Sequence, residues 1–197
     1  RLSKLDLNSP VSVAMDTVTV TALLTDKNNP AVFANGRTVS FYFRGSTFTA
    51  VTDVTGVAVS TFSGPVSSGT YQISAYFDGD PVYEASSSTS SATVQTRAIS
   101  ISVNDSSAYP FEQFIASATV KDSATLAPIE ARLLVFELDG TQNSGASSAA
   151  GLSTAAYTPP AVFGDYELEV SYPGDATYSA SVSTGNVSVM RRPTALA

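Results

Sequence analysis

The 197-residue chain contains no cysteine, no histidine and no tryptophan. Without cysteine it can form no disulfide, no thiolate metal site and no cysteine nucleophile. Without histidine it can build neither a Ser-His-Asp relay nor a histidine-ligated metal site. Serine is abundant, but no lysine is placed beside a glycine-flanked serine as a base. These absences predict a protein that is not an enzyme and that needs no cofactor.

Charged side chains are also scarce, and their signs are unbalanced. Only 14% of the residues are charged, and the formal net charge is −7. An acidic chain repels the phosphates of nucleic acids and the surface of anionic membranes. No apolar run reaches the roughly 18 residues that suggest a membrane-spanning helix. We therefore expect no nucleic-acid partner and no membrane insertion.

The residues that are present favour β-structure. Hydrophobic residues make up 43% of the chain, which is enough for a core, and valine, serine and threonine are frequent. Valine and threonine are β-branched and fit a pleated surface better than a helix. The segments 18–24 and 71–77 alternate apolar and polar side chains, which is the period of a half-buried strand. Between such segments, Asn35-Gly36 is a tight-turn signal because both residues tolerate positive φ.

The sequence is internally repeated. The segment Gly69–Thr89 recurs as Gly164–Thr184, and both copies contain Gly-x-Tyr followed by Gly-Asp-x-x-Tyr. Weaker matches extend upstream to the first residue with a period of about 96 residues. We infer two domains, residues 1–96 and 97–191. Residues 192–197 are expected to begin a further repeat or to form a tail, since Arg192 aligns with the arginines that start both domains.

Each repeat contains about seven short strands separated by turn residues, which predicts an antiparallel β-sandwich. The joint between the two copies is very short, roughly residues 95–98. Such a joint favours a stiff, extended pair over two domains that tumble freely.

The run Arg37–Ser88 resembles the prokaryotic Ig-like repeat family of bacteria and archaea. The resemblance rests on a Thr-Val-x-Phe strand and on the glycine- and tyrosine-rich segment from Gly69 to Ser86. The second copy is similar but weaker, with Val170 where the first has Ala75. The resemblance implies an all-β fold of two tandem seven-stranded antiparallel Ig-like β-sandwiches. It also implies an extracellular or cell-surface location and a non-catalytic structural or spacer role in a stalk, an adhesin or an envelope assembly.

Two other roles stay open beside that of a spacer whose partners are neighbouring Ig-like repeats. The chain could be a subunit of a homopolymeric extracellular filament or layer, in which residues 2–7 or 192–197 are donated as a strand to an identical subunit. It could also be an adhesion module that binds a glycan or a host surface protein. This last role predicts an exposed aromatic cluster in one copy only, for which Phe33, Phe48 and Phe62 are candidates.

Few acidic side chains could hold a metal ion. Asp78, Asp80 and Glu84 form a weak candidate for a Ca²⁺ site, which needs six to eight oxygen ligands. The second copy keeps only Asp175 at these positions. The alternative is structural: Gly79-Asp80 and Gly174-Asp175 would shape a turn through hydrogen bonds from the backbone to the aspartate side chain. No other metal ligands and no catalytic residues are expected.

Four tyrosines and two asparagines complete the set of candidates. Tyr71 and Tyr166 are expected to place the ring in the core and the hydroxyl on a nearby backbone group, as in a tyrosine corner. Tyr83 and Tyr178 recur in both copies, which favours a packing role over a sugar-stacking one. Asn104 and Asn186 begin Asn-x-Ser sequences and are candidates for N-glycosylation.

Overall fold

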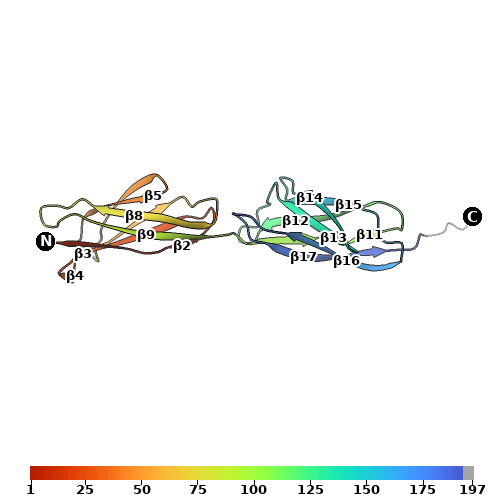
Figure 1. The fold of residues 1–197 in the computed structure, drawn as a ribbon, viewed down its shortest axis with the longest axis horizontal. Coiled ribbons are helices and arrows are strands. Elements are labelled where there is room, and N and C mark those ends of the chain that lie inside the picture. Colours follow the sequence, from red (N-terminus) through yellow and green to blue (C-terminus); the bar gives the residue numbers. More distant parts are fainter. Residues whose placement is uncertain (193–197) are drawn as a thin grey trace, which may run out of the picture. The chain divides into compact units, whose positions relative to one another are not determined.

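The computed structural model describes residues 1–192, which form strands, turns and irregular segments (Figure 1). The chain divides into two compact units, Arg1–Thr96 and a second that begins at Arg97. Within the described part of the chain, no helix is long and apolar enough to cross a membrane. Residues 193–197, which belong to the segment expected to begin a further repeat, lie outside the described residues.

The first unit is a sandwich of two sheets. Its strands are β1 (Ser3–Leu7), β2 (Val11–Val13), β3 (Val18–Asp26), β4 (Asn29–Phe33), β5 (Thr38–Phe43), β6 (Ser46–Val51), β7 (Val57–Phe62), β8 (Gly69–Phe77) and β9 (Ser86–Gln95). In one sheet β3 is central, with β1 along one edge and β7 and the short β4 along the other. The other sheet has the order β2-β9-β8-β5-β6.

The second unit repeats this arrangement without a counterpart of β4 among its described strands. They are β10 (Ile99–Val103), β11 (Ser106–Ala108), β12 (Phe114–Asp122), β13 (Leu133–Leu138), β14 (Thr141–Ala146), β15 (Leu152–Tyr157), β16 (Gly164–Tyr172) and β17 (Ser181–Val189). One sheet has the order β10-β12-β15, and the other has the order β11-β17-β16-β13-β14.

The first strand of each unit is interrupted and changes sheets. β1 pairs antiparallel with β3, whereas β2 pairs parallel with β9. Pro10 lies at the break, has no N–H for a ladder, and accepts a hydrogen bond at its carbonyl from the N–H of Thr93. The second unit makes the same switch from β10 to β11. If each interrupted strand is counted once and the short β4 is left out, each unit has seven strands. The predicted seven-stranded sandwich is therefore confirmed in both units.

The parallel pairs β2–β9 and β11–β17 are the departure from the expected antiparallel pairing among the described strands. Their cause is the interruption itself, because the chain crosses to the other sheet without reversing its direction. β1 pairs with β3 over its whole length, so in this structure residues 3–7 are a strand of their own unit rather than one donated to another copy.

Alternating side chains place one core inside each sandwich. Phe41, Phe43 and Ile73 are fully buried in the first unit, and Leu134 and Phe136 are fully buried in the second. Burial of these side chains removes apolar surface from water and supplies the main stabilising free energy of each unit.

Candidate functional site

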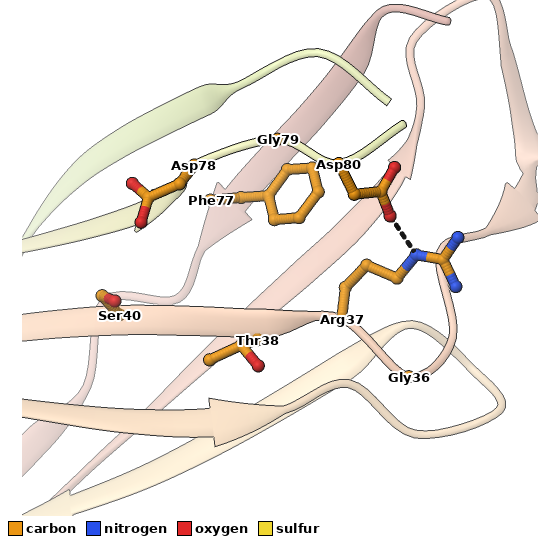
Figure 2. Close-up of a pocket in the computed structure, with 8 residues that line it drawn as sticks. All are labelled: Gly36, Arg37, Thr38, Ser40, Phe77, Asp78, Gly79 and Asp80. Carbon is orange, nitrogen blue, oxygen red and sulfur yellow. Dashed lines mark hydrogen bonds and ion pairs between the residues drawn. The ribbon is translucent and has the colours of Figure 1, made fainter. Parts of the chain in front are cut away.

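The turn after β8 brings Asp80 against Arg37, which precedes β5 (Figure 2). The Oδ1 atom of Asp80 accepts hydrogen bonds from the backbone N–H groups of Val82 and Tyr83, each at 2.7 Å. Its Oδ2 atom accepts a hydrogen bond from Nε of Arg37 at 2.8 Å. The Tyr83 N–H lowers the pKa of Asp80 below its usual value; desolvation opposes this shift, and the Val82 N–H and the Arg37 charge reinforce it. Both carboxylate oxygens are therefore engaged within the turn.

Glycine is required at the same place in both turns. Gly79 has a φ of +88°, and a Cβ added there would lie 2.9 Å from the backbone nitrogen of Ala85. Gly174 has a φ of +87°, and its added Cβ would lie 2.8 Å from the backbone nitrogen of Ala180. A side chain would meet both the left-handed backbone conformation and a rigid backbone neighbour.

Arg37 is held by a buried hydroxyl and by a ring. Oγ1 of Thr52 accepts a hydrogen bond from the N–H of Arg37 at 2.8 Å and donates one to the carbonyl of Ala34 at 2.5 Å. The guanidinium of Arg37 lies over the ring of Tyr83, 5.6 Å from its centroid. We refer to Arg37, Thr52, Asp80 and Tyr83 as the arginine–aspartate cluster of the first unit.

The second unit builds a corresponding arginine–aspartate cluster from Arg132, Ser147, Asp175 and Tyr178. Asp175 Oδ1 accepts hydrogen bonds from the backbone N–H groups of Thr177 and Tyr178 at 2.7 Å. Ser147 Oγ accepts a hydrogen bond from the N–H of Arg132 at 2.9 Å. The Arg132 guanidinium lies 5.0 Å from the Tyr178 ring centroid, and its Nε lies 3.5 Å from Asp175 Oδ2. The same type of side-chain network therefore holds the corresponding turn in each of the two units.

Tyr172 is an addition to this network, at the position where the first unit has Phe77. Burial, together with the hydrogen bond and negative charge of Asp175, raises the pKa of Tyr172 to about 12. Burial also pushes the pKa of Asp175 upward, but the Tyr178 N–H, the Tyr172 hydroxyl and the other donors outweigh it and leave that pKa lowered. Asp175 is thus kept ionised, with Arg132 as its nearby cation.

The calcium candidate of the first unit is not assembled. Figure 2 shows the carboxylate of Asp78 directed away from that of Asp80, whose oxygens are both engaged. Among residues 1–192, no group of three or more acidic side chains is close enough together to hold a metal ion, so Asp78, Asp80 and Glu84 do not form such a group. The bonds that Asp80 accepts are those of a structural turn.

The tyrosines that repeat in both copies have structural contacts. Tyr83 and Tyr178 are buried beneath their arginines, so their rings do not form a sugar-stacking surface. The hydroxyl of Tyr71 donates to the carbonyl of Ser67 at 2.7 Å, and that of Tyr166 donates to a carbonyl four residues earlier at 2.9 Å. Both of these rings pack against the core of their unit.

The second unit also contains a buried ion pair. Arg97 Nε lies 2.6 Å from Asp122 Oδ2, and the two side chains are 9% and 7% exposed. The hydrogen bond from Arg97 lowers the pKa of Asp122 to about 2, against the effect of its desolvation. In the first unit the matching pair, Arg1 and Asp26, lies 3.7 Å apart with Arg1 exposed. The only sequence signal for this pair was that both residue types recur with the repeat.

The two glycosylation candidates differ in accessibility. Asn104 is exposed between β10 and β11, and its Nδ2 donates to Ser117 Oγ at 2.9 Å. Asn186 lies partly buried within β17, where its Nδ2 donates to Ser188 Oγ at 3.0 Å and to Asp165 Oδ1 at 3.4 Å. Glycosylation of either residue stays a prediction, and Asn104 is the more accessible acceptor.

The prediction of an exposed aromatic cluster is wrong for one of its three residues. Phe33 and Phe48 are 45% and 46% exposed, but Phe62 is a core residue. The reason is the facing of β7, whose alternation points Ala58, Ser60 and Phe62 inward. Phe48 makes an edge contact with Phe62, with the ring centroids 5.0 Å apart.

No family model matches the chain, and no curated protein matches it. Solved structures do. The titin domains Z1Z2 in complex with telethonin match with a TM-score of 0.50 and 15% sequence identity, covering 95% of this chain and 96% of that chain. Both units have an immunoglobulin-like fold. The Ig-like pair also matches the adhesin InvE of Yersinia pseudotuberculosis with a TM-score of 0.44 and 16% identity, covering 95% of this chain and 59% of that chain. Identities this low establish the fold alone.

Proposed function

We propose that this chain is a non-catalytic structural pair of Ig-like repeats in a secreted or cell-surface protein of a bacterium or archaeon. It acts as a spacer in a stalk, an adhesin or an envelope assembly, with neighbouring repeats as its partners. The observation that carries the proposal is the duplicated arginine–aspartate cluster. In each unit the same turn is held by a buried hydroxyl, an arginine–aspartate ion pair and a tyrosine ring packed beneath the arginine. Such reinforcement is expected of modules that must keep their shape.

The strand pairing within each unit suits a load-bearing role. β2 lies near the start of the first unit, β9 is its last strand, and the two are parallel. A pull on the two ends of the unit would slide these strands past each other and load their hydrogen bonds together. β11 and β17 have the same relation in the second unit. Parallel pairing of the terminal strands therefore supports a mechanical function.

Labelling of intact cells of the source organism with an antibody raised against this chain tests the location. We expect the antibody to label cells that have not been permeabilised, while an antibody against a cytosolic protein, used in parallel, does not. Labelling that needs permeabilisation would contradict the proposal. Removal of surface sugars before labelling separates masking by glycans, for which Asn104 is the accessible acceptor, from an internal location.

A further inference from the structure

The outward side of the five-stranded sheet in the first unit is free of charge along four of its strands. The residues of β5, β6, β8 and β9 that alternate with core positions are serine, threonine, glutamine, one valine and two tyrosines. We call these outward residues the neutral face. Its two aromatic members, Tyr42 and Tyr76, are each 46% exposed.

The sheet register places the two tyrosines close together. Tyr42 on β5 lies opposite Ser74 on β8, and Ser40 lies opposite Tyr76. Tyr42 and Tyr76 are therefore diagonal neighbours on adjacent strands, a separation of about 7–8 Å that aromatic side chains can span. Because both strands are interior to the sheet, the backbone ladder holds this pair in place before any ligand arrives.

A pocket lies at one end of the neutral face. It is lined by Thr38 and Ser40 from β5, by Asp78 after β8, and by the turn of the arginine–aspartate cluster (Figure 2). Ser40 belongs to both features, since it lines the pocket and lies opposite Tyr76. Through Ser40, the hydroxyl and carboxylate groups of the pocket continue the surface that carries the exposed rings, and polar groups combined with aromatic ones are typical of small-ligand sites.

The second unit shows that the fold does not require this face. Tyr42 and Tyr76 are replaced there by Glu137 and Ser171. Glu137 lies directly opposite Glu169, a pairing of like charges that costs stability. Ser40 and Asp78 of the pocket are likewise replaced by a valine and a proline. The same sheet is therefore acidic in one unit, and neutral and aromatic in the other.

We propose that the neutral face of the first unit binds an uncharged polysaccharide, a binding activity that goes beyond the spacer role. The C–H faces of a sugar ring carry partial positive charge and pack against the negative face of an aromatic ring, while sugar hydroxyls exchange hydrogen bonds with serine, threonine and glutamine. Along its four strands the neutral face has no cation, and the Arg37 guanidinium in the adjoining pocket is paired with Asp80, so the surface has little attraction for an acidic polysaccharide or a nucleic acid. A serine-rich surface is also unlike the centre of a protein–protein interface, where serine is depleted. A neutral, hydroxyl-rich chain is the partner that complements this surface.

Calorimetric titration of the full chain with neutral oligosaccharides of glucan, xylan, mannan and chitin tests the proposal, with heparin as the anionic probe. We expect binding to at least one neutral sugar and none to heparin. Tyr42→Ala and Tyr76→Ala should each weaken this binding about tenfold, and Tyr42→Phe, which keeps the ring, should retain it. Phe163→Ala is the matched control, because Phe163 is an aromatic of the second unit that is 48% exposed.

Melting temperatures of all variants verify that the units stay folded, which is expected for exposed positions. Absence of binding to every neutral sugar, binding to heparin alone, or binding that survives both tyrosine-to-alanine changes would overturn the proposal. Self-association that disappears in Tyr42→Ala, without sugar binding, would identify a second copy as the partner and would overturn it as well. These outcomes are independent of the cell-labelling test, so the spacer role and the sugar site can fail separately.

Discussion

Arg97 joins Asp122 in a buried ion pair at the start of the second unit, with 2.6 Å between Nε and Oδ2. The backbone of Arg97 also donates to the carbonyl of Thr177 at 2.7 Å and accepts from the N–H of Ser179 at 2.8 Å. One residue thus ties the start of this unit to the end of β12 and to the segment before β17.

Arg97→Ala should destabilise the second unit by about 3 kcal/mol, because it leaves the carboxylate of Asp122 buried without its cation. Arg1→Ala is the matched control, since Arg1 is 61% exposed and lies 3.7 Å from Asp26, and its loss should cost less than about 1 kcal/mol. Urea unfolding of the full chain measures both changes. Equal losses in the two variants would show that burial of the pair does not matter.

The same ion pair should give the second unit an acid-sensitive stability. The folded pKa of Asp122 is about 2, below its usual 3.8, so the folded state favours the ionised form. Its contribution is complete above about pH 5 and is lost as the pH falls through the folded pKa near 2. The stability difference between wild type and Asp122→Asn should therefore shrink between pH 5 and about 2 in urea melts. A difference that stays constant over this range would contradict the assignment.

Gly79→Ala should destabilise the first unit by about 3 kcal/mol or more, because its Cβ meets both a left-handed backbone and the nitrogen of Ala85. Gly36→Ala separates the two causes. Gly36 has a similar φ of +72° but open space around the added Cβ, so the change should cost only about 1 kcal/mol. Thermal unfolding measures the loss of stability in both variants. Similar losses would show that the left-handed backbone conformation alone, and not the contact with Ala85, accounts for the effect.

Thr52→Val should cost about 2 kcal/mol, since it removes the buried hydroxyl that links Ala34 to Arg37 and leaves both backbone groups without their partner. Thr49→Val, on the exposed strand β6, is the control and should change the stability by less than about 0.5 kcal/mol. Chemical denaturation measures both. If the two changes cost the same, the hydroxyl of Thr52 does not organise the cluster.

Features that depend on neighbours in the sequence were predictable from it. The backbone N–H groups that donate to Asp80 and Asp175 belong to residues two and three positions ahead, and the Tyr71 hydroxyl donates to a carbonyl four positions back. The alternation of apolar and polar residues predicted the long strands, and about seven such segments per repeat predicted the sandwich, but neither predicted the short β4 or the parallel pairs β2–β9 and β11–β17. The Gly-Asp-x-x-Tyr motif was therefore enough to predict the turn, because the aspartate and the N–H groups that bind it lie within the motif.

Features that depend on strand register were not predictable in the same way. Arg37 lies 43 positions from Asp80, and only the pairing of β5 with β8 brings them together. Recurrence of the arginine in both copies was the one available signal. The neutral face depends on which side chains of four strands point outward, and Phe62 was expected on the surface although the alternation of β7 turns it inward.

Stretching single molecules of the full chain tests the central claim, that the protein is a pair of independently folded structural repeats, most directly. We predict two separate unfolding steps, each lengthening the chain by about 30 nm, the contour length of roughly 96 residues. A single step that releases the whole chain, or gradual extension without steps, would contradict this account.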